Sequence, residues 1–265
     1  TPTHEEIYRA VGKLNLTSPG NTGANACAYK ALLDHDGCMG MVVDFVLEFW
    51  ESEETPVEWE MGLLKILPKS GDLSQPGNHR GIMLLEVGYK VVANIIKFRT
   101  NPILESLDHE SQCGFRSGRG CSDASFVLRM SAKKRREHGM ETWIMLLDLV
   151  KAFDRVPREL LWLVLLKFGV PAKLVNLLKA LHRDVNVRFT VDEVEVILKS
   201  IIGVKQGDLL GPPLFTFYIC AIMQAWRINY DGPSCVFRTK MDSVTHGRRW
   251  NTGGRACDKG AVKPT

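Results

Sequence analysis

The stretch Trp143-Ile-Met-Leu-Leu-Asp148-Leu-Val-Lys151-Ala-Phe153-Asp154-Arg-Val156 carries one carboxylate from the end of an apolar run into a turn. Residues 143 to 147 are uncharged and predict a buried strand, and the charged residues after Asp148 mark the return of the chain to solvent. A carboxylate at a strand end has a rigid base and an open front, which suits metal-assisted phosphoryl transfer. Taken alone, an Asp in this position is more often an ordinary turn residue.

A second motif, Gly203-Val204-Lys205-Gln206-Gly207-Asp208-Leu209-Leu210-Gly211-Pro212, follows downstream. Between the two motifs, apolar residues recur at helical spacing around Leu160 and again around Leu174, and then alternate with polar residues from 185 to 198. The order strand, two helices, hairpin, helix predicts an α+β fold and not a regular βαβ repeat. The pair of motifs is more specific than either motif alone.

Together the two motifs resemble those of the reverse transcriptases of non-LTR (LINE-like) retrotransposons. Three upstream segments fit the same family in the same order: Leu67-Pro68-Lys69-Ser70-Gly71-Asp72, Asn78-His79-Arg80-Gly81-Ile82 and Gln112-Cys113-Gly114-Phe115-Arg116-Ser117-Gly118-Arg119-Gly120. The resemblance begins near Ala10 and runs to about Trp250. It implies the fingers and a partial palm of a polymerase right hand, with an antiparallel palm sheet flanked by helices.

Four segments are expected on this basis. Residues 1–60 form a helical N-terminal lead-in, 61–140 the fingers, 141–232 the partial palm and 233–265 a truncated or aberrant tail. Local patterns add a capping box at Thr3 and Glu6, helices near 39–50, 86–99 and 122–136, a strand over 62–67 and a loop over 68–79.

The resemblance implies a catalytic role for Asp148, which would bind both ions of a Mg²⁺ pair, with the main-chain carbonyl of Leu149 as a further ligand. It places Phe153 under the sugar of the incoming nucleotide, where the ring would collide with a 2′-hydroxyl and so select deoxynucleotides. We assign Asp154 a structural role, as an N-cap or in an ion pair with Arg155 or Arg158.

The resemblance also implies contacts with the nucleotide outside the carboxylate turn. Gln206 and Gly207 would pass beneath the nascent base pair, because glycine allows the backbone to approach closely. Lys69, Arg80 and Arg116 would hold the triphosphate, and arginine suits this because its planar fork binds phosphate oxygens in pairs. Simple surface solvation is the alternative for each of these three cations.

The chain departs from the family pattern at the second acidic centre. No aromatic-Ala-Asp-Asp tetrapeptide occurs in it, and the nearest remnant is Ala256-Cys257-Asp258-Lys259. Asp258 is either a degenerate metal ligand or part of an out-of-frame or foreign tail from about Gly253, and we favour the tail because no return strand follows. Near the start, Thr22 stands where the family usually carries Asp.

Composition is compatible with nucleic-acid binding without demanding it. The chain has 34 basic and 30 acidic residues, a formal charge of +4, and its densest basic run is Lys133-Lys134-Arg135-Arg136. This run either contacts nucleic acid or is a solvated helix end that complements the helix dipole. Seven cysteines without a Cys-x-x-Cys pair indicate reduced thiols, and with no signal peptide at the start we expect an intracellular protein, nuclear or cytoplasmic and not secreted.

The sequence therefore predicts an RNA-directed DNA polymerase domain that extends a DNA primer on an RNA template with dNTPs and Mg²⁺. The uncharged stretch 209–226 is interrupted by Gly, Pro, Thr and Gln, so we expect a protein-buried helix there and no membrane partner. Because one acidic centre is missing, we expect no polymerase activity from the chain as it stands. The alternatives are a catalytically dead fragment that only binds nucleic acid and a pseudogene product without function.

Overall fold

The computed structural model describes residues 1–107, 112–191 and 193–229. The chain divides into two compact units, Thr1–Ile222 and Met223–Thr265. The predicted tail over 233–265, including Asp258, lies outside the described residues. The fold is α+β, as expected, with helices around one mostly antiparallel sheet.

Three helices and two short 3₁₀ turns begin the chain. They are α1 (His4–Gly12), α2 (Ala26–Ala31), η1 (Leu32–Asp34), α3 (Asp36–Ser52) and η2 (Val57–Trp59). The predicted capping box starts α1, since the Thr3 hydroxyl accepts from the Glu6 amide while the Glu6 carboxylate accepts from the Thr3 amide. The left-handed residue Glu53 ends α3.

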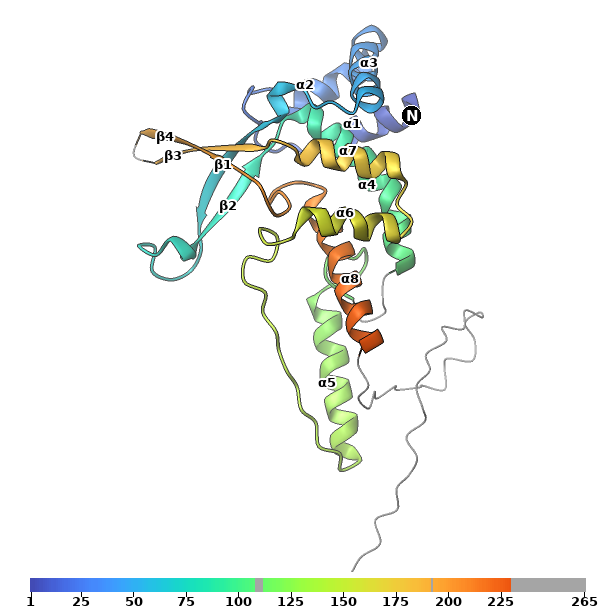
Figure 1. Cartoon of the computed structure of the whole chain (residues 1–265), viewed down its shortest axis with the longest axis vertical. Helices are drawn as coiled ribbons and strands as arrows, with labels where there is room; N and C mark the ends of the chain where they lie inside the picture. Colours follow the sequence, from blue (N-terminus) through green and yellow to red (C-terminus); the bar gives the residue numbers. More distant parts are fainter. Residues whose placement is uncertain (108–111, 192, 230–265) are drawn as a thin grey trace, which may run out of the picture. The chain divides into compact units, whose positions relative to one another are not determined.

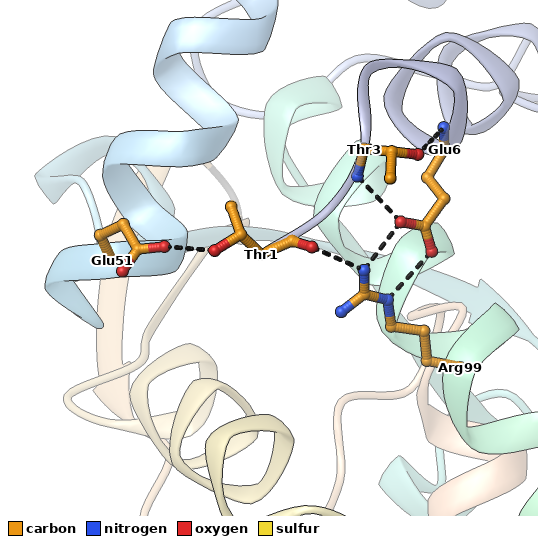
Figure 2. Close-up of polar contacts among 5 residues, drawn as sticks. All are labelled: Thr1, Thr3, Glu6, Glu51 and Arg99. Atoms are coloured by element: carbon orange, nitrogen blue, oxygen red, sulfur yellow. Dashed lines mark hydrogen bonds and ion pairs between the residues drawn. The ribbon is translucent and has the colours of Figure 1, made fainter.

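Arg99 ties the N-terminus to the fourth helix, α4 (Val87–Leu107). Its guanidinium donates to the Glu6 carboxylate at 2.7 Å and to the Thr1 carbonyl at 3.0 Å, as Figure 2 shows. The hydrogen bond from Arg99 lowers the pKa of Glu6 to about 2. The Thr1 hydroxyl in turn donates to Glu51 of α3 at 2.7 Å, so three segments are joined by side chains at one point.

The sheet has the strand order β2-β1-β3-β4 (Figure 1). Its strands are β1 (Met61–Pro68), β2 (His79–Leu84), β3 (Asn186–Val191) and β4 (Val194–Lys199), with the turn η3 (Pro76–Asn78) before β2. The two hairpins are antiparallel, but β1 and β3 pair in parallel from Met61 opposite Asn186 to Leu63 opposite Arg188. This junction joins the predicted fingers hairpin to the hairpin that precedes the Gln206-Gly207 motif.

The remaining helices are α5 (Cys121–Glu137), α6 (Arg158–Lys167), α7 (Ala172–His182) and α8 (Gly211–Asn229). Helices α4 and α7 are largely buried and supply much of the core, because their apolar residues recur at offsets of three and four. By contrast, α5 contains no buried residue. No helix in the described ranges has both the length and the apolarity that a membrane crossing requires.

The predicted strand over 143–147 is wrong for this structure. Residues 141–149 are irregular, and apolar side chains that a strand would have buried face solvent, with Trp143 92% and Leu146 84% exposed. A strand is stable only when a neighbour accepts its backbone hydrogen bonds, and no described segment pairs with this one. An apolar run favours a strand, but it does not determine whether a neighbouring strand is present to pair with it.

Candidate functional site

Two backbone hydrogen bonds fasten the turn after Asp148 to the loop before Gln206. The Val204 amide donates to the Phe153 carbonyl, and the Gly203 amide donates to the Val156 carbonyl, each at 2.9 Å. Gly203 has φ +81°, and a methyl group built on it would lie 2.6 Å from the Asp154 carbonyl oxygen. The two motifs therefore meet through backbone contacts that only glycine permits.

Arg158, at the start of α6, holds the same loop from the other side. Its guanidinium donates to the carbonyls of Gly203 at 2.8 Å, His182 at 2.8 Å and Ser200 at 2.9 Å, and to the Ser200 hydroxyl at 2.9 Å. The fork geometry of arginine suits several fixed acceptors at once. The guanidinium of Arg158 therefore binds the 200–203 loop. It does not form an ion pair with Asp154, which was one of the two ion pairs predicted for that carboxylate.

The Gln206-Gly207 loop rests on β2. The Met83 amide donates to the Gln206 carbonyl at 2.8 Å. Gly207 has φ +103°, and a methyl group there would approach the Met83 carbonyl to 2.7 Å. The close approach expected of Gly207 therefore occurs, but in this structure the neighbour it meets is a strand of the protein.

Three aromatic rings from three segments of the chain come together beside this loop. Phe153 stacks on Phe215 of α8, with ring centroids 4.9 Å apart and planes 23° apart. Phe115, from the segment that also holds Arg116, meets Phe153 edge-on at 5.9 Å. These arrangements are favourable for aromatic pairs, and they give the half-buried Phe153 ring a defined place.

Beneath the loop lies a buried polar group. The Tyr89 hydroxyl donates to the Asp208 carboxylate at 2.5 Å, and the Leu210 amide donates to its other oxygen at 3.2 Å. Burial raises the pKa of Asp208, and it lowers the pKa of Lys205 to about 8. The Lys205 ammonium lies 4.3 Å from the centre of the Tyr89 ring.

Thr22 contacts the carboxylate of Glu86 through two hydrogen bonds. Its amide donates to the Glu86 carboxylate at 2.9 Å and its hydroxyl donates to the other Glu86 oxygen at 2.5 Å. Glu86 is 5% exposed. An aspartate at position 22 could not donate and would set two carboxylates against each other.

The three predicted triphosphate ligands lie on segments that make different contacts. Arg80 is exposed in β2, three residues before Met83, and half-buried Arg116 adjoins Phe115. Lys69 follows β1, and its ammonium donates to the Gly77 carbonyl of its own hairpin loop at 3.2 Å. The structure thus places Arg80 and Arg116 on segments that contact the Phe153 and Gln206 loops, whereas the Lys69 contact is local.

Asp148 and Leu149 are exposed on the irregular segment before Phe153. Within the described ranges, His, Cys, Asp and Glu nowhere gather in threes able to hold a metal ion. Asp148 supplies one carboxylate, and a divalent site of oxygen ligands needs more. The described residues therefore do not form a complete metal site.

The basic run 133–136 lies at the C-terminal end of α5. Lys133, Lys134 and Arg136 are exposed, and Lys133 makes a loose ion pair with Glu137 at 3.9 Å. Arg135 is half-buried and donates to the Glu141 carbonyl at 2.7 Å. One of the four cations therefore helps to close the helix end, which leaves three on the surface.

Comparison with known proteins decides the family. The profile described as reverse transcriptase (RNA-dependent DNA polymerase) matches residues 67–243. This chain belongs to the reverse transcriptase family. The match includes the Phe153 turn, the Gln206-Gly207 loop and both segments that carry Arg80 and Arg116, so the expected reverse transcriptase of a non-LTR retrotransposon is confirmed.

Its relatives are proteins of transposable elements. It is 28% identical over 199 residues to "Transposon TX1 uncharacterized 149 kDa protein" of Xenopus laevis, which covers 69% of this chain and 15% of that protein. It is 29% identical to a Pol polyprotein of the R2 element of Popillia japonica, covering 80% and 29%, and 31% identical to "Probable RNA-directed DNA polymerase from transposon X-element" of Drosophila melanogaster, covering 62% and 18%. The chain thus spans less than a third of each of these relatives.

Sequence reasoning missed the residues that hold this reverse transcriptase loop in place. The sequence predicts only a helix around Tyr89, and it presents Lys205 and Asp208 only as members of the 203–212 motif. Their one detectable signal is that two charges flank Gln206-Gly207 inside an otherwise apolar segment. The five cysteines in the described ranges are all free thiols.

Proposed function

We propose that this chain supplies the fingers and part of the palm of an RNA-directed DNA polymerase, which extends a DNA primer on an RNA template with dNTPs. The observation that carries the proposal is the joining of the Phe153 turn to the Gln206-Gly207 loop by direct backbone hydrogen bonds. These two loops are the family's nucleotide-binding motifs, and they meet although two helices and a hairpin separate them in the chain. Because RNA templates and dNTPs are found inside cells, we propose an intracellular reaction.

In the proposed reaction the primer 3′-oxygen attacks the α-phosphorus of the dNTP. A new phosphorus–oxygen bond forms, the bond to the bridging oxygen of pyrophosphate breaks, and the 3′-hydroxyl proton leaves to solvent. Such chemistry depends on position and charge neutralisation. Arg80 and Arg116, with Lys69, would neutralise the triphosphate, and the shielded Phe153 ring would exclude a 2′-hydroxyl.

Magnesium would supply the remaining charge neutralisation when bound. Asp148 and the Leu149 carbonyl are the proposed protein ligands, and a second acidic centre would be needed beside them. Asp258 is the less favoured candidate for that second centre, because the sequence around it is better explained as an aberrant tail. The proposed division into lead-in, fingers and palm follows the same reasoning, with residues 61–140 as fingers and 141–232 as partial palm.

The first prediction is that the 265-residue chain alone does not extend a primer. Only one secure carboxylate is present where two metal-binding centres are required. Primer extension on an RNA template with Mg²⁺ and dNTPs is the measurement, with Asp148→Ala as the matched variant. Synthesis by the chain that disappears in Asp148→Ala would show an active enzyme and would promote Asp258 to a metal ligand.

The second candidate function is nucleic-acid binding without synthesis, and the exposed cations Lys133, Lys134 and Arg136 favour it. Replacing these three by alanine should reduce the slope of log affinity against log salt concentration by up to about 3, because each phosphate contact releases about one counterion. Arg135 stays, since it closes the helix end. Alanine at Lys13 and Lys179, exposed lysines near the ends of other helices, is the control. An equal slope in both variants would reduce the run to a solvated helix end.

A further inference from the structure

The Gln206-Gly207 loop is bounded by two buried charges of opposite sign. Lys205 is 3% exposed and Asp208 6% exposed, while Gln206 is half-buried and Gly207 exposed. The two residues proposed to meet nucleotide or template thus point outward between two anchors that point inward. Buried charged side chains are rare unless they are paired, so this pattern requires a physical account.

One residue of α4 contacts both anchors. The Tyr89 hydroxyl donates to Asp208 at 2.5 Å, and its ring receives the Lys205 ammonium at 4.3 Å. Tyr89 is 1% exposed, so both contacts are shielded from water. Trp59 packs edge-on against the same ring at 5.8 Å, which fixes the ring plane.

Stability alone does not explain this arrangement. The Lys205 ammonium has no hydrogen-bond partner among the described residues, and a buried unpaired donor is unfavourable. Arg158 adds a second positive charge nearby and His182 is a further titratable neighbour, whereas Asp208 is the compensating negative charge. An apolar side chain at position 205 would avoid this desolvation, so the retained charges are better explained by the conformation that they impose.

We propose that Lys205, Asp208 and Tyr89 are positioning residues that lock the Gln206-Gly207 loop onto β2, in the conformation that meets a nucleotide or template. The lock works because both ends of the loop are drawn to the same Tyr89 side chain, which leaves the Gln206 carbonyl in place for the Met83 amide. That this loop binds nucleotide or template rests on the proposed function; the lock itself does not.

Hydrogen exchange of the Met83 amide, followed by NMR in the full chain, tests the lock. Asp208→Asn leaves Lys205 buried without a counter-charge, so Met83 should lose about tenfold or more of its protection. Tyr89→Phe removes only the hydroxyl and should give a smaller loss in the same direction.

The controls separate local loosening from general destabilisation. Thr100→Val removes a buried hydroxyl of α4 that bonds only within its own helix, to the Ile96 carbonyl at 2.9 Å and the Lys97 carbonyl at 3.2 Å. The Leu178 amide of buried α7 reports global opening. The proposal is supported by amide protection that falls more at Met83 than at Leu178 in Asp208→Asn and Tyr89→Phe, but not in Thr100→Val. Met83 protection that follows Leu178 in every variant would overturn it.

A parallel measurement keeps the lock and the proposed function apart. Equilibrium binding of an RNA template annealed to a DNA primer tests the function, with the wild-type chain and Gln206→Ala. If the wild-type chain does not bind this duplex, the proposed function fails, and the exchange result still decides the lock. Weaker binding in both Tyr89→Phe and Gln206→Ala would support the lock as a positioning device for that duplex.

Discussion

Replacing Gly203 by alanine should lower the free energy of unfolding by roughly 3 kcal/mol or more. The new methyl group would lie 2.6 Å from the Asp154 carbonyl oxygen and 2.7 Å from the Asp154 Cα, both of them backbone atoms that cannot turn aside. The same substitution would disrupt the hydrogen bonds from the Gly203 and Val204 amides to the Phe153 turn. Urea unfolding followed by circular dichroism is the measurement.

Gly169→Ala is the matched control for this experiment. Gly169 has φ +86°, close to the +81° of Gly203, but nothing lies within 4 Å of a methyl group built on it. It should therefore show only the cost of left-handed backbone, about 1 to 2 kcal/mol. The difference between the variants measures the close packing of the two loops, and equal losses would show that the loops do not touch as described.

Acidification from pH 7 to pH 5 should cost about 2 kcal/mol of stability through His182 alone. Burial lowers the pKa of His182 to about 3, and the nearby charge of Lys205 acts in the same direction. The unfolded chain takes up a proton near pH 6.5 while the folded chain does not, so stability falls as the pH drops from 6.5 toward 3. Well above pH 6.5 this residue contributes no pH dependence.

His182→Leu isolates that contribution. The variant loses a hydrogen bond to the Leu178 carbonyl at 2.8 Å but no other, since the second ring nitrogen has no partner among the described residues. Its stability should change less than that of the wild type between pH 7 and pH 5, a range above the one in which Glu6 with its lowered pKa responds. The same acid loss in both proteins would contradict the burial of His182.

Local patterns predicted the helices well because helices depend on near neighbours. The Thr3 capping box and the helix expected near 86–99 each depend on residues within a few turns of one another, and the structure confirms both helices. Helix α4 runs further than expected, to Leu107, with Pro102 inside it.

Contacts between distant segments could not be predicted in this way. The parallel pairing of β1 with β3 and the bond from Tyr89 to Asp208, 119 residues apart, depend on the whole fold. The charge of Lys205 predicts an exposed side chain, because lysine normally stays in water, whereas the structure buries it. The run at 143–147 failed for the opposite reason, since its pattern suited a strand for which the described chain offers no partner.

The central claim is that the Phe153 turn and the Gln206-Gly207 loop form one deoxynucleotide site next to Asp148. Amide line broadening by a Mn²⁺–dNTP complex, in the presence of an RNA template annealed to a DNA primer, tests it most directly. The paramagnetic ion arrives on the triphosphate, so the measurement does not need a complete metal site in the protein. We expect the strongest broadening at Asp148, Phe153 and Gly207, and a weaker effect with the ribonucleotide complex. Broadening centred elsewhere, or equal broadening with the two complexes, would contradict the claim.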